Sequence, residues 1–157
     1  MISGNTAAEL RAKLNAKGPT DEAGRHDALT HWFVKWKYPF DRQAGTCGTG
    51  PVRAELTLRF EMPQWAHGDA APSELVEKWD GYVERLLEHE DGHADNGRAA
   101  ARAIVQALRA MPAMASCDEM DAAANARAEE ILADYRKRDV DYDARTKHGA
   151  TQGAVFP

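Results

Sequence analysis

The chain has 157 residues, of which 29% are charged and 43% hydrophobic, so its composition is that of a soluble globular protein and its length suits one domain spanning residues 1–157. The formal net charge is −5 and the basic residues form no run, which excludes a general affinity for nucleic acid or anionic membranes. No apolar stretch is long enough for membrane insertion, and residues 2–6 lack the apolar core of a signal peptide, so the protein is either cytosolic or exported with its signal already removed.

The amino-terminal segment predicts a short helix over residues 6–14. Thr6 is a suitable N-cap, and Glu9 follows three residues later, as in a capping box. Gly18 and Pro19 then end the helix.

Two segments alternate between apolar and polar residues in the pattern of half-buried strands. The first covers residues 30–38, and the second, which is the clearest alternation in the chain, covers residues 52–62. The intervening residues 39–51 are rich in glycine and threonine and are predicted to form a loop. The two strands are expected to pair in an antiparallel sheet.

Two helices are predicted after the strands. The main helix begins at Ser73 and ends near Met111, with apolar residues in steps of three and four. The second runs from about Cys117 or Asp118 to Arg138, with Asp118 as a candidate cap, and residues 139–157 show neither helical nor strand periodicity. The sequence therefore predicts an α+β fold, in which a small antiparallel sheet packs on the long helix and on a second, C-terminal helix.

The main helix carries the H-E-x-x-H pattern at residues 89–93. His89 and His93 lie one turn apart on the apolar face of the helix, so both imidazoles can reach one Zn²⁺ ion. Polar groups in that position are costly unless something binds them. Glu90 lies between the two histidines and can act as the general base on a zinc-activated water.

Two glycines, Gly92 and Gly97, stand in the same helix. Each costs about 1 kcal/mol of stability relative to alanine. We therefore expect another backbone or a substrate to approach the helix closely at these positions.

A catalytic zinc site usually has three protein ligands. The residue pattern alone does not decide which residue is the third ligand. His148, near the C-terminus, is one candidate. A carboxylate from the second helix is the other, and three are available: Glu119, Asp121 and Glu129.

Other residues near these positions have candidate supporting roles. Asp95 and Asp143 are candidates for orienting the imidazoles. Tyr142 is close to His148 in sequence and is a candidate hydrogen-bond donor to the oxyanion that forms during amide hydrolysis.

The two cysteines, Cys47 and Cys117, lie in segments predicted to be loops. A disulfide between them would close a loop of about 70 residues and contribute about 4 kcal/mol in the chain-entropy model. Two unrelated free thiols are the alternative, and the spacing fits no zinc–cysteine motif.

A resemblance to a known family rests on several motifs besides H-E-x-x-H. They are W-F-V-K-W at residues 32–36, M-P-Q-W at residues 62–65, Trp79, Cys117, and Y-D-x-x-T-x-H-G at residues 142–149. With these motifs the chain resembles, from residue 4 to the C-terminus, a bacterial family of predicted secreted zinc-dependent proteases that is carried as a domain of unknown function. The combination of H-E-x-x-H with the C-terminal motif is more specific than either element alone.

This resemblance implies a zincin-like fold with Zn²⁺ as the cofactor and His148 as the third ligand. It also implies a secreted or periplasmic location and, because disulfides persist there, a bond between Cys47 and Cys117.

The predicted function is that of a zinc metallopeptidase that cleaves a peptide or protein substrate with Glu90 as general base. One alternative is a zinc hydrolase of another amide, such as a cell-wall peptide. The other is a non-catalytic binding module that zinc stabilises.

Overall fold

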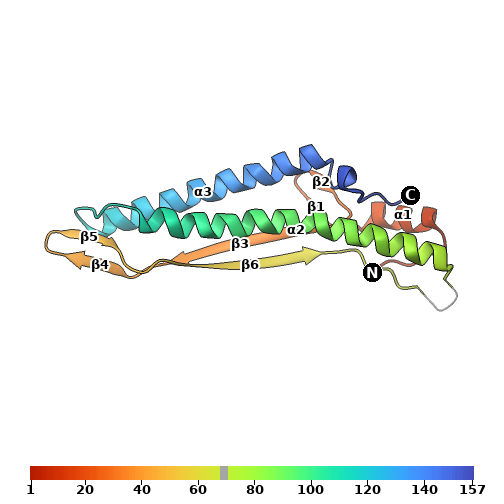
Figure 1. The fold of residues 1–157 in the computed structure, drawn as a ribbon, viewed down its shortest axis with the longest axis horizontal. Coiled ribbons are helices and arrows are strands. Elements are labelled where there is room, and N and C mark those ends of the chain that lie inside the picture. The colour runs from red at the N-terminus through yellow and green to blue at the C-terminus, as the bar shows by residue number, and fades with distance from the viewer. Residues whose placement is uncertain (68–70) are drawn as a thin grey trace. The chain divides into compact units, whose positions relative to one another are not determined.

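The computed structural model describes residues 1–67 and 71–157, and it confirms the predicted α+β class. Its helices are α1 (Ala7–Lys17), α2 (Ser73–Arg109), α3 (Cys117–Thr146) and the short 3₁₀ helix η1 (Ala150–Gln152) (Figure 1). Its strands are β1 (Thr20–Asp21), β2 (Gly24–Arg25), β3 (Leu29–Lys37), β4 (Phe40–Gln43), β5 (Thr46–Thr49) and β6 (Arg53–Glu61). They pair as β1 with β2, β3 with β6, and β4 with β5.

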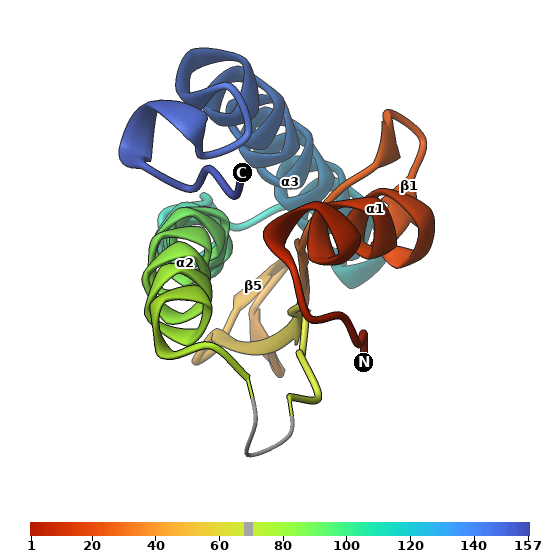
Figure 2. The same ribbon diagram turned by 90° about the vertical axis from the view of Figure 1, so that its right-hand side faces the viewer.

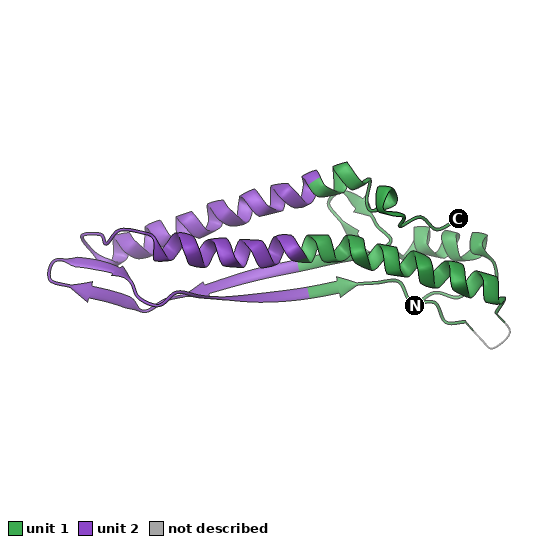
Figure 3. Cartoon of the chain, viewed as in Figure 1, with its two compact units in different colours: residues 1–31, 59–94, 142–157 green, residues 32–58, 95–141 purple. Residues whose placement is uncertain are grey.

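The chain divides into two compact units, coloured separately in Figure 3. Unit 1 contains residues 1–31, 59–94 and 142–157, and unit 2 contains residues 32–58 and 95–141. Neither unit is a continuous stretch of chain. Helix α1 and both termini, which are labelled in Figure 2, belong to unit 1.

The amino-terminal helix begins as the sequence predicts. The Thr6 hydroxyl accepts a hydrogen bond from the Glu9 backbone N–H at 3.2 Å, and the Glu9 carboxylate accepts one from the Asn5 backbone N–H. The first bond satisfies an amide that the first turn of a helix leaves without a partner, and the second ties the residue before the N-cap to the same turn.

Both predicted strands are present as β3 and β6, whose arrows run in opposite directions in Figure 1. Along β6 the residues alternate between exposed and partly buried positions, as expected for a sheet with one covered face. The loop predicted for residues 39–51 is wrong, because β4 and β5 form an antiparallel hairpin there. Its tight turn places Gly45 at a positive φ of 79°, which glycine adopts without strain.

The end predicted for the second helix is also wrong. Helix α3 does not stop at Arg138 but continues to Thr146, and η1 follows it, so most of the supposedly irregular tail is helical. At the other end, the hydroxyl of Ser116, rather than Asp118, accepts the hydrogen bond from the Glu119 N–H. The sequence does not predict the last turns of α3, because they are polar and show no apolar periodicity. Their side chains instead contact residues on α2.

Aromatic side chains hold the C-terminus in unit 1. Phe156 is 4% exposed, and its ring centroid lies 5.4 Å from that of Trp79 and 5.1 Å from that of Tyr82, both on α2. Trp65 also packs on Trp79. This cluster anchors the segment that follows η1, and so fixes the C-terminal motif against the helix that carries H-E-x-x-H.

The core of unit 2 is mainly aliphatic. Its buried residues come from β3, the residue just before β6, α2 and α3, and include Val34, Val52, Ile104, Leu108 and Met120. Among the described residues, no helix combines the length and the apolar character that crossing a membrane requires.

The disulfide expected from the family resemblance is confirmed: Cys47 in β5 is bonded to Cys117 at the start of α3, in unit 2. Two backbone hydrogen bonds of 2.8 Å between Cys47 and Met114 support the same junction.

We expect loss of this disulfide to destabilise the protein by about 4 kcal/mol, because the bond closes a long loop in the unfolded chain. The paired change Cys47→Ala and Cys117→Ala should lower the melting temperature by roughly 8–16 °C. Thermal unfolding with and without a reductant checks this, since the reductant should affect only the wild-type protein. An unchanged melting temperature would contradict the expectation.

Candidate metal centre

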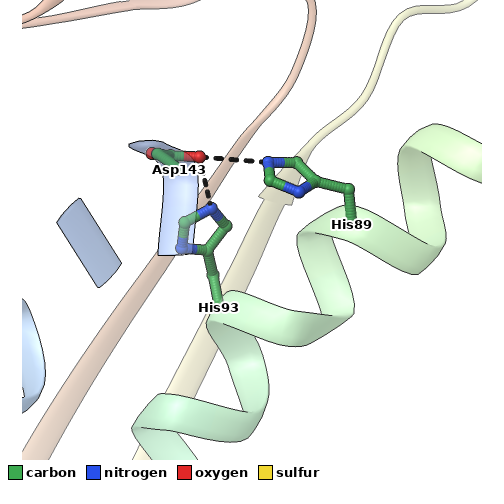
Figure 4. Close-up of side chains that lie close together, drawn as sticks. All are labelled: His89, His93 and Asp143. Carbon is green, nitrogen blue, oxygen red and sulfur yellow. Dashed lines mark hydrogen bonds and ion pairs between the residues drawn. The ribbon is translucent and has the colours of Figure 1, made fainter. Parts of the chain in front are cut away.

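Two imidazoles and one carboxylate converge inside unit 1. His89 and His93 are 3% and 9% exposed on α2, and Asp143 lies near the end of α3. The Oδ1 atom of Asp143 is 3.1 Å from the Nε2 atom of His89 and 3.2 Å from that of His93 (Figure 4). One ligand atom from each residue lies within 4.8 Å of the others, so the group could hold a metal ion.

The two separations that involve Asp143 can be compared with those of a zinc site. Bonds of roughly 2.0–2.1 Å in a tetrahedral site place neighbouring ligand atoms about 3.3 Å apart. The separations of 3.1 and 3.2 Å between Asp143 and the two histidines are close to that value. Imidazole nitrogen and carboxylate oxygen are also atoms that zinc accepts. The donor set is therefore chemically suited to a metal ion such as zinc.

The histidines strongly favour the charged form of Asp143. Burial alone would raise the pKa of this carboxyl, but hydrogen bonds from His89 and His93 hold the pKa well below its usual range. Asp143 is therefore an anion at neutral pH and is available as a ligand or as a partner of the imidazoles.

Glu90 lies next to this group and is almost completely covered. It is 3% exposed, and its Oε2 atom accepts a hydrogen bond of 2.7 Å from the Thr30 hydroxyl on β3. Burial raises the pKa of the Glu90 carboxyl, although the Thr30 hydrogen bond and the nearby histidines oppose that rise. A raised pKa suits a general base, because the group can accept a proton and then release it.

His148 lies beside the His–His–Asp group. Its Nδ1 atom is 3.5 Å from Asp143 Oδ1, its side chain is 59% exposed, and its ring packs against that of His26. Lys147 and His148 both have positive φ values, 51° and 52°, a conformation that costs residues other than glycine of order 1 kcal/mol each. This strained turn ends α3 and brings His148 back towards Asp143.

The rest of the C-terminal motif builds that turn. The buried Thr146 hydroxyl donates to the Tyr142 carbonyl at 2.8 Å and accepts from the Gly149 N–H at 3.4 Å. Gly149 has a φ of 81°, and a Cβ there would lie 3.0 Å from His89 Cγ. Both the backbone conformation and the close packing therefore require glycine at this position.

Tyr142 packs directly on the H-E-x-x-H helix. Its ring is stacked on that of His89, with centroids 5.0 Å apart and planes 11° from parallel, and its hydroxyl donates to the His89 carbonyl at 3.2 Å. A methyl group at Gly92 would overlap the Tyr142 hydroxyl and ring. The expectation of a backbone or substrate at the two helix glycines is thus corrected: the Tyr142 ring occupies the space at Gly92, and in unit 2 the Trp32 ring occupies that at Gly97.

Gly92→Ala should therefore disturb the site, whereas Gly81→Ala in the same helix should not. A Cβ at Gly81 meets no atom within 4 Å, so alanine there should stabilise the protein by about 1 kcal/mol through helix propensity. Overpacking against Tyr142 should leave Gly92→Ala less stable than Gly81→Ala by about 1–3 kcal/mol. Denaturant unfolding measures both, and equal stabilities would show that Tyr142 yields without cost.

The structure thus groups some of the predicted residues and separates others. His89, Glu90, His93, Tyr142 and His148 all belong to unit 1. The alternative carboxylates belong to unit 2: Glu119, Asp121 and Glu129. Asp121 accepts a hydrogen bond from the Tyr38 hydroxyl there.

Sequence reasoning missed the contributions of Thr30 and Gln152, and it gave Asp143 only an orienting role. Gln152 Oε1 lies 3.0 Å from His89 Nδ1. No periodicity marks such residues, because their partners are 60 or more positions away in the chain. The sequence offered one indication of their role: Asp143 and Gln152 lie on either side of the turn that contains His148.

The fold and this group define an α+β protein with a candidate His–His–Asp metal centre. A family model described as a bacterial protein of unknown function (DUF922) matches residues 1–149, so the chain belongs to that family. No curated protein matches the chain, and no solved structure matches it either.

Proposed function

We propose that the protein is a zinc-dependent hydrolase, and specifically a metallopeptidase. The observation that carries the proposal is the convergence of His89, His93 and Asp143 at ligand spacing, with the buried carboxyl of Glu90 on the same helical turn. This arrangement supports a metal site that has a base beside it.

In the proposed hydrolysis, the metal ion and the protein side chains have different roles. A bound zinc ion would polarise the scissile carbonyl and lower the pKa of water towards ~7. Glu90 takes the proton that the attacking water loses and delivers it to the leaving amine. The hydroxyl of Thr30 holds the Glu90 carboxylate through its hydrogen bond of 2.7 Å, which limits rotation of the base. The oxyanion role of Tyr142 stays a prediction.

We further propose that the substrate is a peptide or protein outside the cytoplasm. The Cys47–Cys117 disulfide supports this location, because such bonds persist in oxidising compartments. Hydrolysis of unfolded proteins by the zinc-loaded enzyme tests the reaction class. Release of peptides that stops on chelation supports it, and cleavage of cell-wall amides alone would move the enzyme to the other hydrolase class.

The third ligand can be assigned by comparing two variants. The ligand spacing of Asp143 makes it the geometric choice, while His148 is the choice that the family resemblance implies. We expect Asp143→Asn to weaken zinc binding by more than the roughly 100-fold that loss of a ligand-orienting partner can cost. His148→Ala should weaken it less. The reverse order, measured by competition with a chromogenic chelator, would make His148 the ligand.

The non-catalytic alternative has one observation in its favour. Glu90 is 3% exposed and hydrogen-bonded to Thr30, which is also how a purely structural carboxyl would be held. Zinc binding that stabilises the fold without any hydrolysis would establish this alternative.

A further inference from the structure

Three hydrogen-bond contacts link His89, Gln152 and Tyr142 in a closed ring, through the His89 ring nitrogen that does not face Asp143. His89 Nδ1 lies 3.0 Å from Gln152 Oε1, Gln152 Nε2 donates to the Tyr142 hydroxyl at 3.1 Å, and that hydroxyl donates to the His89 carbonyl at 3.2 Å. Each of the three residues contacts the other two, and all belong to unit 1. The proposed function assigns no role to Gln152.

The two ring nitrogens of His89 face competing partners. An imidazole that gives its Nε2 lone pair to a metal must carry its hydrogen on Nδ1. The carboxylate of Asp143, 3.1 Å from Nε2, favours a hydrogen on Nε2 instead. Without an acceptor at Nδ1, the tautomer that cannot bind metal would be preferred.

We propose that Gln152 is a positioning residue that holds His89 in its metal-binding tautomer. This inference rests on the proposed metal site. In this tautomer the Gln152 oxygen accepts the Nδ1 hydrogen and His89 no longer donates to Asp143. The Nε2 lone pair is then directed at the position between His93 and Asp143.

Tyr142 favours the orientation in which the Gln152 amide oxygen faces His89. The Tyr142 hydroxyl lies 3.1 Å from Gln152 Nε2 and 3.3 Å from Gln152 Oε1, and it can only accept from the amide when its own hydrogen goes to the His89 carbonyl. If the amide turned over, its NH₂ group would donate to Nδ1 and the lone pair of Nε2 would be lost to a hydrogen. In the observed orientation the NH₂ group donates to the Tyr142 hydroxyl, which leaves the amide oxygen for His89. The stacking of Tyr142 on His89 and its tight fit over Gly92 keep the hydroxyl in place.

Zinc affinity of substituted proteins tests the role of Gln152. Gln152→Met keeps the side-chain length but removes the acceptor, and should weaken zinc binding about 10–100-fold. Gln152→Glu keeps an acceptor oxygen and should remain close to wild type. Thr151→Val is the matched control, because Thr151 lies in the same short helix but bonds the Thr146 carbonyl rather than His89. Its affinity should not change.

Two further measurements separate this role from a general structural one. In the zinc-loaded protein, long-range ¹H–¹⁵N spectra of the imidazoles should show the His89 hydrogen on Nδ1. Tyr142→Phe should weaken zinc binding in the wild type, but much less in the Gln152→Met background, because Tyr142 acts through Gln152.

The possible outcomes separate the proposed role of Gln152 from the proposed zinc site on which it rests. A wild-type protein that binds no zinc refutes both. A protein that binds zinc with the same affinity in Gln152→Met as in the wild type, or that carries the His89 hydrogen on Nε2 when loaded, refutes the role of Gln152 alone.

Discussion

Replacement of Glu90 by glutamine is expected to slow peptide hydrolysis strongly and to leave zinc bound. The amide has nearly the same shape as the carboxylate and can still contact the Thr30 hydroxyl, so the fold should survive. It cannot accept the proton of the attacking water, and loss of a general base typically lowers the rate about 10²–10⁴-fold. Turnover of an unfolded protein substrate and zinc content should be measured on the same sample.

Glu88→Gln is the matched control for this change. Glu88 lies two residues earlier on the same helix, is exposed, and pairs with Arg85 at the surface, so its loss should leave turnover unaltered. Full activity in the Glu90→Gln variant would eliminate Glu90 as the base. Loss of zinc in that variant would instead make Glu90 part of the metal site.

Replacement of His93 by alanine should abolish tight zinc binding and the stabilisation that zinc gives the wild-type protein. Two of the three converging ligand atoms are imidazole nitrogens from α2, and a zinc site cannot keep high affinity with one of them gone. Zinc at 100 times its dissociation constant should stabilise the wild-type protein by about 2.7 kcal/mol. This corresponds to a rise in melting temperature of roughly 5–11 °C, which the variant should not show.

His67→Ala provides the control for non-specific binding by imidazole. His67 packs beside Trp65 and lies outside the group that could hold a metal, so its variant should respond to zinc as the wild type does. An equal zinc-induced shift in His93→Ala would place the metal elsewhere in the chain.

The parts of the fold with clear hydrophobic periodicity could be predicted from the sequence. The alternation of residues 52–62 predicted β6, and the steps of three and four predicted α2. The hairpin at residues 40–49 was missed because its strands are only four residues long, and because β4 is exposed throughout and β5 does not alternate between exposed and buried residues. The final turns of α3 were missed because their buried groups are polar.

The site was only partly predictable for the same physical reason. The spacing of His89 and His93 follows from helix geometry alone, so the sequence was sufficient to place them on one face. Asp143 and Gln152 join them through contacts across more than 50 residues of chain, which no local pattern encodes. The strained turn at His148 likewise depends on packing against α2 rather than on local preference.

The most direct test is a crystal of the zinc-loaded protein, examined by anomalous scattering at the zinc edge. We expect one strong peak about 2.0–2.1 Å from the Nε2 atoms of His89 and His93, with an Asp143 oxygen at a similar distance. A zinc-saturated crystal with no peak there, in which both imidazoles still donate to the Asp143 carboxylate, would contradict a metal site at these residues.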